Sequence, residues 1–570
     1  MFRQIVATSD LRETRVAVLE DGKTVEIYVE RPSAQRIAGN LYKGRVANVL
    51  PGMQAAFVNI GLEKNAFLYI DDCDQTEWLR RHPHDKPTIS DLLTVNQEIV
   101  VQVSKEPVNN KGARVTQKLT LPGRYVVLMP GNREAAVSRR IDDPVERERL
   151  QMIVEPLVDA QNGLIARTAA IGVAERMIRE DFKFLSGLWQ RIERQIRTVK
   201  TPALVHRDVD LISRTVRDLF TIDVDQFITD SSDVYQTVLE ILNFVDPFLA
   251  GRAVLEPHPT SLFGKYRIDQ DLDKALRRRV WLRNGGYLVI DQTEALTVID
   301  VNTGKYTGTD VLETTVRTNL EAAREIARQI RLRDIGGMIV VDFIDMSRER
   351  HRQEVLAELE HLIKRDRTKT QIFGTTSLGL VEMTRKKVRQ SLDEVLQKTC
   401  PYCEGKGKVR SEEAMAAKIE RAIREQHSSA VESQMPAAAM FVEAHPLVAA
   451  ALIGPGGNYL DKLEQDLRIP VYIKGKERLH LRDFKIVPTS SVEQAESLAF
   501  PVAIGQVVEV FVEEPHVNNP LNGIARIEGY VIDVEDGSMY VGQRVPVEIG
   551  QVYRTYAKGR PCISITNGNR

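Results

Sequence analysis

Short apolar runs and a helical spacing of apolar positions follow one another in the middle of the chain. Residues 287–290, 296–299 and 338–341 are short aliphatic or β-branched runs bounded by turn residues. Between the second and third runs, apolar side chains recur every three or four residues over 316–330, which is the period of an amphipathic helix. The pattern predicts buried strands connected through a helix that ends at the glycine pair 336–337.

Each of the last two runs is followed by an aspartate. Asp300 and Asn302 follow the first of them, and Asp342 follows the second. In open sheets, ligands bind at the edge where such strands end. Two carboxylates beside an amide suit Mg²⁺, which keeps several waters and takes one or two carboxylates with substrate phosphate oxygens. The alternative is structural: Asp300 begins a turn, and Asp342 or, more readily, Asp345 caps the next helix.

In the first 121 residues the pattern of apolar and polar positions predicts a series of short strands. Residues 1–35 alternate around a tight turn and are too few to fold alone, so they must pack on a later segment. Residues 36–121 contain about five short strands with glycines at the corners, which predicts a small OB-type barrel. Phe57 and Phe67 either stack RNA bases, with Lys111 near the RNA backbone, or belong to the barrel core.

The next segment combines strands with one long helix. Residues 122–207 open with a strand and turn, and 173–199 have helical spacing. Arg167 and Thr168 leave a strand together, so a guanidinium fork and a hydroxyl can grip a terminal phosphate. An exposed ion pair is the alternative. Residues 208–275 mix strands and helices.

Basic residues flank the acidic strands. They are residues 277–279 with Arg283 before the strands, and a predicted helix face of residues 385–387 with Arg389 after them. A nuclease needs such groups to hold the phosphate backbone near its metal ion. A solvated helix face is the alternative for the second group.

The cysteines give a separate signal. Cys400 and Cys403 have the C-x-x-C spacing with which two thiolates bind one zinc ion. Structural zinc takes four ligands, and Cys73 and Cys562 stand alone without knuckle flanks. The sequence therefore predicts a zinc ion shared by two chains, which makes the protein an oligomer. A redox dithiol and a pair of free thiols are the alternatives.

Three segments follow the cysteine pair. Residues 411–434 are polar and rich in alanine and glutamate, which indicates a linker. Residues 435–495 look like a KH-type RNA module, but the Gly-Pro-Gly-Gly loop at 454–457 carries no basic residue, so a packing role is equally open. Residues 500–565 alternate strands with glycine turns and look like a TRAM-type β-barrel.

Composition limits the class of protein. A chain of 570 residues predicts three to five domains at roughly 100–200 residues each. Hydrophobic content of 43%, charged content of 28% and a net charge of −1 describe a globular protein whose polyanion binding depends on local patches. No apolar run reaches the ~18–20 residues of a membrane span, and no signal peptide is expected. Four cysteines favour a reducing compartment, so we expect a cytoplasmic protein.

Five motifs within the first 410 residues carry a family resemblance. They are Asn40-Leu41-Tyr42-Lys43-Gly44-Arg45-Val46, Leu50-Pro51-Gly52-Met53-Gln54-Ala55-Ala56-Phe57-Val58, Val298-Ile299-Asp300-Val301-Asn302, Asp342-Phe343-Ile344-Asp345-Met346 and Cys400-Pro401-Tyr402-Cys403. In this order they resemble the RNase E/RNase G family of bacterial endoribonucleases. The size is RNase G-like, because the long scaffold of the larger members is absent, and the KH-like and TRAM-like modules are additional.

The resemblance implies a multidomain α/β and β-barrel architecture, with an OB-type RNA-binding barrel inserted in an RNase H-like subdomain. The implied divisions are the RNase H-like subdomain (1–35 and 208–275), the barrel (36–121), a 5′-phosphate sensor (122–207), a DNase I-like catalytic subdomain (276–398), the zinc link (399–410), the linker (411–434), the small KH-like domain (435–495) and the TRAM-like barrel (500–565).

It also implies roles for individual residues. Asp300 and Asp342 fall on the magnesium-binding aspartates, and Asn302 falls on the neighbouring asparagine. Phe57, Phe67 and Lys111 match the RNA-gripping face of the barrel. Cys400 and Cys403 match the zinc link between protomers, which form a homodimer or homotetramer.

The resemblance further implies a pocket for a 5′-monophosphate. Arg167 and Thr168 match the sensing pair, and Gly123 and Val127 supply backbone contacts. Lys369 stands where family members often have arginine. The charge is kept and the bidentate fork is lost, so we expect a weaker preference for a 5′-monophosphate.

Together these features predict a magnesium-dependent endoribonuclease. We expect cleavage of single-stranded, AU-rich RNA in rRNA maturation and mRNA decay, stimulated by a 5′-monophosphate and leaving 5′-phosphate and 3′-hydroxyl ends. The alternative is a non-catalytic RNA-binding or ribosome-assembly factor on the same scaffold, against which the intact Asp300, Asn302 and Asp342 speak. A DNA nuclease is disfavoured by the three RNA-binding modules.

Overall fold

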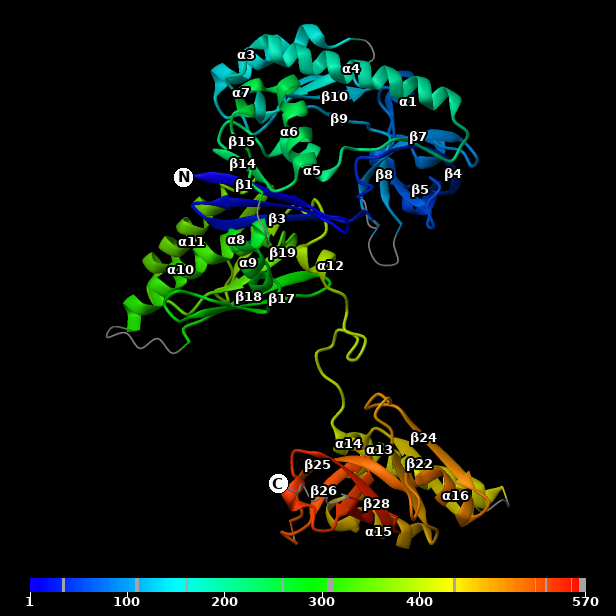
Figure 1. Ribbon diagram of the computed structural model, residues 1–570. Helices are drawn as coiled ribbons and strands as arrows, with labels where there is room; N and C mark the ends of the chain where they lie inside the picture. Colours follow the sequence, from blue (N-terminus) through cyan, green and yellow to red (C-terminus); the bar gives the residue numbers. More distant parts are fainter. Residues whose placement is uncertain are drawn as a thin grey trace. The chain divides into compact units, whose positions relative to one another are not determined.

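The computed structural model describes two compact units, Met1–Gln397 and Lys398–Arg570 (Figure 1). The described residues exclude 33–35, 108–111, 160–161, 258–260, 305–310, 434–436, 518, 528–529, 555 and 563–570, and the side chains of 244–245 and 311–312. The predicted multidomain α/β architecture with β-barrels is confirmed.

The N-terminal strands complete a sheet with residues much later in the chain. Its order is β15-β14-β1-β2-β3, and β1 pairs parallel to β14, which lies beside it in Figure 1. The strands are β1 (Arg3–Ser9), β2 (Thr14–Glu20), β3 (Lys23–Glu30), β14 (Gln226–Thr229) and β15 (Ala253–Leu255). Alternate side chains serve two cores, because Ile5 packs with α5 (Leu211–Asp218) and α6 (Ser232–Val245), whereas Val6 packs with α8 (Leu262–Lys265) and α9 (Ile268–Ala275).

A closed barrel follows in the chain. β4 pairs with both β5 and β7, which closes the ring β4-β5-β6-β8-β7. Its elements are β4 (Leu41–Leu50), β5 (Ala55–Asn59), β6 (Ala66–Tyr69), α1 (Thr76–Arg81), α2 (Ile89–Leu92), β7 (Glu98–Lys105), β8 (Arg114–Thr116) and the added edge strand β13 (Ala203–His206). Val46, Val58, Leu68 and Val101 fill the interior and are fully buried.

A four-stranded sheet, in the order β11-β12-β10-β9, comes next. Its elements are β9 (Leu121–Pro122), β10 (Val126–Pro130), β11 (Ala135–Val137), α3 (Pro144–Val154), β12 (Asn162–Ala166) and α4 (Glu175–Thr198). α4 buries Ile178, Leu185 and Ile192, which share one face, and leaves polar side chains on the opposite face.

The central sheet has the order β16-β17-β18-β19-β21-β20. Its elements are β16 (Arg279–Trp281), β17 (Tyr287–Gln292), β18 (Leu296–Asn302), α10 (Val311–Leu332), β19 (Gly337–Asp342), α11 (Glu349–Ile363), β20 (Thr370–Thr375) and β21 (Val381–Arg385), followed by α12 (Leu392–Leu396). The helix between β18 and β19 is the one that the apolar spacing predicts, and the two strands pair in parallel.

The basic segment after β21 differs from the prediction. It is not a helix face, because β21 ends at Arg385 and residues 386–391 are irregular. Arg385 is buried and pairs with Asp334 at 2.5 Å and Asp366 at 2.7 Å. Arg389 also pairs with Asp334. These two arginines therefore link parts of the fold rather than face solvent.

The second unit contains a three-stranded sheet, in the order β23-β22-β24, and a closed barrel, β25-β26-β27-β29-β28. Its elements are α13 (Glu412–Glu432), β22 (Ala439–Ala444), α14 (Pro446–Ile453), α15 (Asn458–Leu467), β23 (Val471–Gly475), β24 (Phe484–Thr489), α16 (Val492–Ala499), β25 (Val507–Pro515), β26 (Gly523–Ile527), β27 (Tyr530–Val534), β28 (Arg544–Val552) and β29 (Tyr556–Pro561).

The predicted linker at 411–434 is wrong for most of its length. α13 is a capped helix whose Met415, Ile419 and Ile423 are fully buried in the core that also holds β22 and α14. The stripe is narrow and surrounded by alanine and glutamate, so composition alone resembles a polar spacer.

We predict that Ile419→Ala lowers the free energy of opening of the second unit by about 2–4 kcal/mol, because it leaves a cavity in this core. Hydrogen exchange read by mass spectrometry resolves 398–570 from the rest of the chain. Arg421→Ala, an exposed position on the same helix, serves as the control. Equal exchange in both variants would mean that α13 behaves as a linker.

Candidate active site and nucleic-acid surfaces

The two candidate metal ligands lie directly opposite each other. Asp300 of β18 and Asp342 of β19 are register partners in neighbouring parallel strands. Both side chains are exposed, while Ile299 and Val341, one position earlier in each strand, are fully buried. The hydrophobic alternation therefore fixes the face on which the carboxylates stand.

Asn302 shares that face and orients one carboxylate. Its Nδ2 donates to Asp300 Oδ2 at 2.7 Å. The amide thereby fixes the side chain of Asp300 and leaves the other carboxylate oxygen for a ligand. An orienting partner of this kind is typical of metal-binding carboxylates.

The local charge is negative. Partial burial, followed by the charges of Asp300 and Asp345, raises the pKa of Asp342 above its usual value. Among the described residues, none of these three aspartates forms a salt bridge with a basic side chain. Uncompensated carboxylates at this spacing favour a bound cation.

The donor set is small. The part of the chain that the structure describes contains no group of three or more His, Cys, Asp or Glu side chains placed to hold a metal ion. Asp300 and Asp342 provide two protein carboxylates, which is the number that Mg²⁺ accepts when waters and substrate phosphates complete its octahedron. The residues present therefore fit magnesium better than a metal that needs a full protein cage.

Asp345 is not the helix cap that the sequence predicted. α11 begins at Glu349, and its N-cap position is Arg348, without a side-chain capping bond. Asp345 is exposed in the segment between β19 and α11 and adds negative charge near Asp342. The sequence placed the helix start too early because Asp345 precedes a serine and several charged residues that have no apolar period.

The two phenylalanines of the barrel stand on its outer face. Phe57 of β5 and Phe67 of β6 are register partners, and both are half-buried. Their ring centroids are 5.9 Å apart at an interplanar angle of 69°. The side chains before and after each of them fill the barrel interior, so the barrel-core alternative is wrong for this pair. Lys111, the third residue of the predicted RNA-gripping face, lies outside the described residues.

Arg167 is held in place within the predicted 5′-phosphate pocket. Arg167 donates to the carbonyl of Gly123 and, at 2.7 Å, to Asp218 Oδ1. Thr168 is exposed and begins a short 3₁₀ turn, and Val127 of β10 is half-buried. Although burial opposes its ionisation, Arg217 and Arg167 lower the pKa of Asp218, which stays charged and holds the Arg167 fork.

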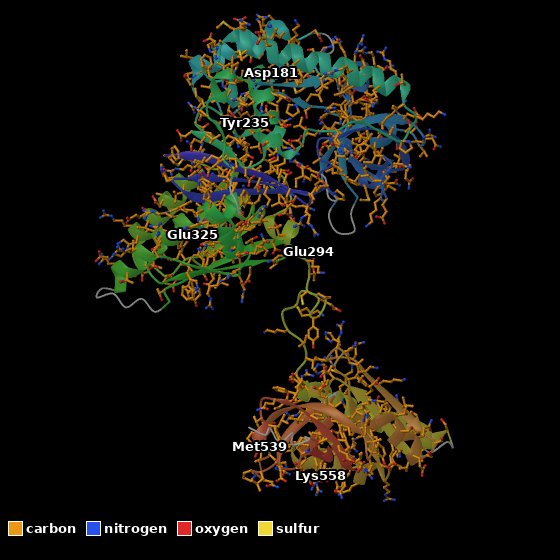
Figure 2. All side chains as sticks on the ribbon, in the orientation of Figure 1. Asp181, Tyr235, Glu294, Glu325, Met539 and Lys558 are labelled. Atoms are coloured by element: carbon orange, nitrogen blue, oxygen red, sulfur yellow. The ribbon has the colours of Figure 1, made fainter. Side chains whose placement is uncertain are left out.

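Asp181, which sequence reasoning missed, supports this pocket from behind. It projects from α4 (Figure 2) and accepts the backbone N–H groups of Arg124 at 3.3 Å, Tyr125 at 2.8 Å and Val126 at 3.0 Å. A Cβ at Gly123 would stand 2.5 Å from the Asp181 carboxylate, so only glycine fits there. Burial raises the pKa of Asp181, against the opposing effect of the three amide bonds.

Lys369 lines a groove that is rich in basic side chains. The groove has a volume of about 730 Å³ and is also lined by Arg139, Arg140 and Lys364. Lys369 is exposed, and no described contact joins it to Arg167. Arg140 donates to the carbonyl of Arg367, whose guanidinium donates to the carbonyl of Asp218 at 3.2 Å, so the groove and the Arg167 site share a chain of contacts.

The cysteine pair occupies an irregular segment of the second unit. Cys400 is exposed and Cys403 is half-buried. Backbone N–H groups of Cys403 and Tyr402, followed by the Cys403 side chain, lower the pKa of the Cys400 thiol. The loop is held by the Tyr402 ring, whose centroid is 4.0 Å from that of His480. Two adjacent thiols with a stabilised thiolate suit zinc but supply only half of a structural site.

The glycine loop of the second unit connects α14 to α15. Gly454, Gly456 and Gly457 all have positive φ, and a Cβ at Gly454 would stand 2.4 Å from the Tyr459 ring.

No helix among the described residues is long and apolar enough to cross a membrane.

Comparison with known proteins gives three family matches: the Ribonuclease E/G family over residues 120–388, the RNase E/G thioredoxin-like domain over 399–489 and the TRAM domain over 501–562. The thioredoxin-like match covers the region that we predicted to be KH-like, and the KH-like interpretation stays a prediction. The TRAM match confirms the interpretation of the last barrel.

Curated relatives extend these matches over most of the chain. Ribonuclease G of Escherichia coli strain K12 is 41% identical over 469 residues, which cover 81% of this chain and 95% of that protein. Ribonuclease G of Haemophilus influenzae is 40% identical over 482 residues, which cover 83% and 97%. Ribonuclease E of Escherichia coli K12 is 36% identical over 430 residues, which cover 75% of this chain and 40% of that protein.

Asp181→Ala leaves three backbone donors without their acceptor, and we expect it to lower the free energy of unfolding by about 2–4 kcal/mol. Urea unfolding followed by tryptophan fluorescence measures the change, since Trp189 lies on the same helix. Asp142→Ala, at an exposed position, is the matched control. A loss below about 0.5 kcal/mol would show that the loop does not depend on this carboxylate.

Proposed function

The chain belongs to the Ribonuclease E/G family, and on that premise we propose that it is a magnesium-dependent endoribonuclease that cuts single-stranded, AU-rich RNA. The observation that carries the proposal is the register pair Asp300 and Asp342, two exposed carboxylates without a basic partner among the described residues. Cleavage leaves a 5′-phosphate and a 3′-hydroxyl.

Asp300 and Asp342 would hold the metal ion, and Asn302 keeps Asp300 in position through its hydrogen bond. A magnesium ion bound there supplies a Lewis acid for the phosphodiester and lowers the pKa of a water. The protein holds both aspartates rigidly in place, because they stand on strands whose other face is buried in the core of the central sheet. We assign residues 276–398 to the DNase I-like catalytic subdomain.

The barrel provides a surface for single-stranded RNA. Its closed strand order β4-β5-β6-β8-β7 supports the OB-type assignment. Phe57 and Phe67 present half-exposed rings on which bases can stack, and base–aromatic stacking contributes about 1–3 kcal/mol per base. Lys111 is assigned to the RNA backbone.

The Arg167 site is proposed to sense a 5′-monophosphate. Arg167 is held in place by Asp218 and the Gly123 carbonyl, with Thr168 exposed beside it and Val127 on the adjoining strand. The groove with Arg139, Arg140 and Lys369 adds positive charge along the approach. Lysine at 369 keeps the charge without the bidentate fork, so the preference for a monophosphorylated end is modest.

The biological setting follows from the same premise. The proposed substrates are rRNA precursors and mRNA, in rRNA maturation and mRNA decay within the cytoplasm. Cys400 and Cys403 of two protomers are proposed to share a structural zinc ion, giving a homodimer or homotetramer. The TRAM domain is an additional candidate RNA-binding surface.

Asp300→Asn and Asp342→Asn are expected to lower the cleavage rate of a short AU-rich RNA in magnesium by about 100-fold or more, because each removes a metal-binding charge. Glu294→Gln makes the same carboxylate-to-amide change at an exposed turn before β18 (labelled in Figure 2) and should retain full activity. Circular dichroism checks that the variants are folded.

Two results would contradict the metal-hydrolase assignment. Undiminished cleavage in both aspartate variants would place the activity elsewhere or in a contaminant. Absence of cleavage by the wild-type protein, despite bound RNA and metal, would favour a non-catalytic RNA-binding or ribosome-assembly factor.

Arg167→Gln should bring the cleavage rates of 5′-monophosphorylated and 5′-hydroxyl RNA together, and Lys369→Arg should raise their ratio by up to about 10-fold by restoring a bidentate fork. The comparison uses one RNA sequence with the two end groups. Arg350→Gln, at an exposed position on α11, is the matched control. A ratio that is unchanged in Arg167→Gln would remove the sensor role from this residue.

A further inference from the structure

A cavity of about 440 Å³ lies within the first unit, apart from the Asp300 site. The end of β3, helix α5 and the segments 366–368 and 385–395 form its wall. Arginines and carboxylates line this wall together, and the arginines include Arg36, Arg214, Arg331, Arg367, Arg385 and Arg389. The question is which of these guanidinium groups the carboxylates leave without a charged partner.

Some of these arginines are neutralised by carboxylates within the same wall. Arg331 donates to Glu26 at 2.8 Å, and Glu26 also accepts from the Tyr28 hydroxyl at 2.6 Å. Arg385 donates to Asp334 and Asp366, and Arg389 also donates to Asp334. These carboxylates are engaged by donors that lie beside them.

Two other arginines, Arg367 and Arg214, have weaker partners. Arg367 donates to the carbonyls of Asp218 at 3.2 Å and Leu219 at 3.5 Å, and forms no salt bridge within the described residues. Arg214 donates to the Val209 carbonyl at 2.9 Å, and the Glu30 carboxylate is 3.8 Å away. Uncharged carbonyl acceptors or a distant carboxylate leave much of a guanidinium charge uncompensated.

Two buried N–H donors in the cavity wall have no hydrogen-bond partner. In the described part of the chain, the Nε–H groups of Arg36 and Arg214 are buried without a hydrogen-bond partner. Burial, followed by the charge of Arg214, lowers the pKa of Arg36, and Arg389 acts in the same direction against Glu106 and Asp208. One carboxylate oxygen of Glu30, in the same wall, is also buried without a partner. The two unpaired N–H groups outnumber it, so this part of the cavity is complementary to an anion with acceptor oxygens.

We propose that this cavity binds a small phosphate monoester of the 5′-nucleoside monophosphate class through Arg36, Arg214 and Arg367. Arginine forks match phosphate oxygens, and the volume lies within the roughly 300–1,000 Å³ of small-molecule sites. Leu211, Val388 and Leu392 line the same cavity and offer an apolar surface to the body of the ligand. The proposal is independent of the nuclease assignment, since it involves neither RNA nor the Asp300 site.

The cavity also touches the Arg167 site through one residue. Asp218 lines the cavity, its carboxylate accepts from Arg167, and its carbonyl accepts from Arg367. A phosphate held by Arg367 therefore acts on the residue that orients Arg167.

The experiment is calorimetric titration of the full-length protein in magnesium-free buffer with 5′-AMP, inorganic phosphate and adenosine. We expect binding of 5′-AMP and phosphate and none of adenosine. Arg36→Gln should weaken 5′-AMP binding at least about 10-fold, because it removes a charged donor. Arg214→Lys, which keeps the charge and loses the fork, should weaken it less, and Arg350→Gln should leave it unchanged.

Three outcomes would overturn the proposal. They are no binding of either phosphate compound, equal affinity in wild type and Arg36→Gln, and loss of binding only in Arg167→Gln, which would place the ligand in the 5′-end pocket. Thermal melts in phosphate-free buffer add a separate reading. Arg36→Gln should melt no lower than wild type, since it removes like-charge repulsion, and a lower midpoint would make Arg36 a structural group instead.

Discussion

The parallel pairing of β18 with β19 is the constraint on which the geometry of the proposed active site depends. The hydrogen-bond ladder places Asp300 opposite Asp342, and the buried Ile299 and Val341 prevent either strand from turning its acidic face away. A slip of one residue in either strand would send the carboxylate of that strand into the core, so hydrophobic burial specifies the register. Two like charges are thus held together by the apolar side chains beneath them.

A network of buried arginines fixes this sheet against the rest of the first unit. Arg331, at the end of α10, donates to Glu20 at 2.9 Å and Glu26 at 2.8 Å, and so connects the helix between β18 and β19 with the N-terminal sheet. Arg385 joins Asp334 and Asp366 in a similar way. Buried ion pairs add little net stability compared with apolar packing, but they allow only one arrangement of their partners. The network therefore sets alignment more than stability.

The sequence predicted those helices and strands whose formation depends on residues close together in the chain. The strand–helix–strand around Asp300 and Asp342 was predictable because the strands are short aliphatic or β-branched runs and the helix has apolar side chains every three or four residues. α13 was mistaken for a linker, because its three buried side chains are diluted by alanine and glutamate. Asp181 gave no signal at all, since its role depends on a backbone loop 55 residues away in the chain. The inward direction of Arg385 and Arg389 was equally invisible, because their partners come from distant segments.

The discontinuous N-terminal sheet has a consequence for the order of synthesis. β1, β2 and β3 leave the ribosome about two hundred residues before β14, the strand that covers the open edge of β1. At roughly 5–20 residues per second, that edge waits for about 10–40 s. The barrel strands between β4 and β8 are complete well within this interval. The strands of the inserted barrel are thus complete while one edge of β1 still has no partner strand.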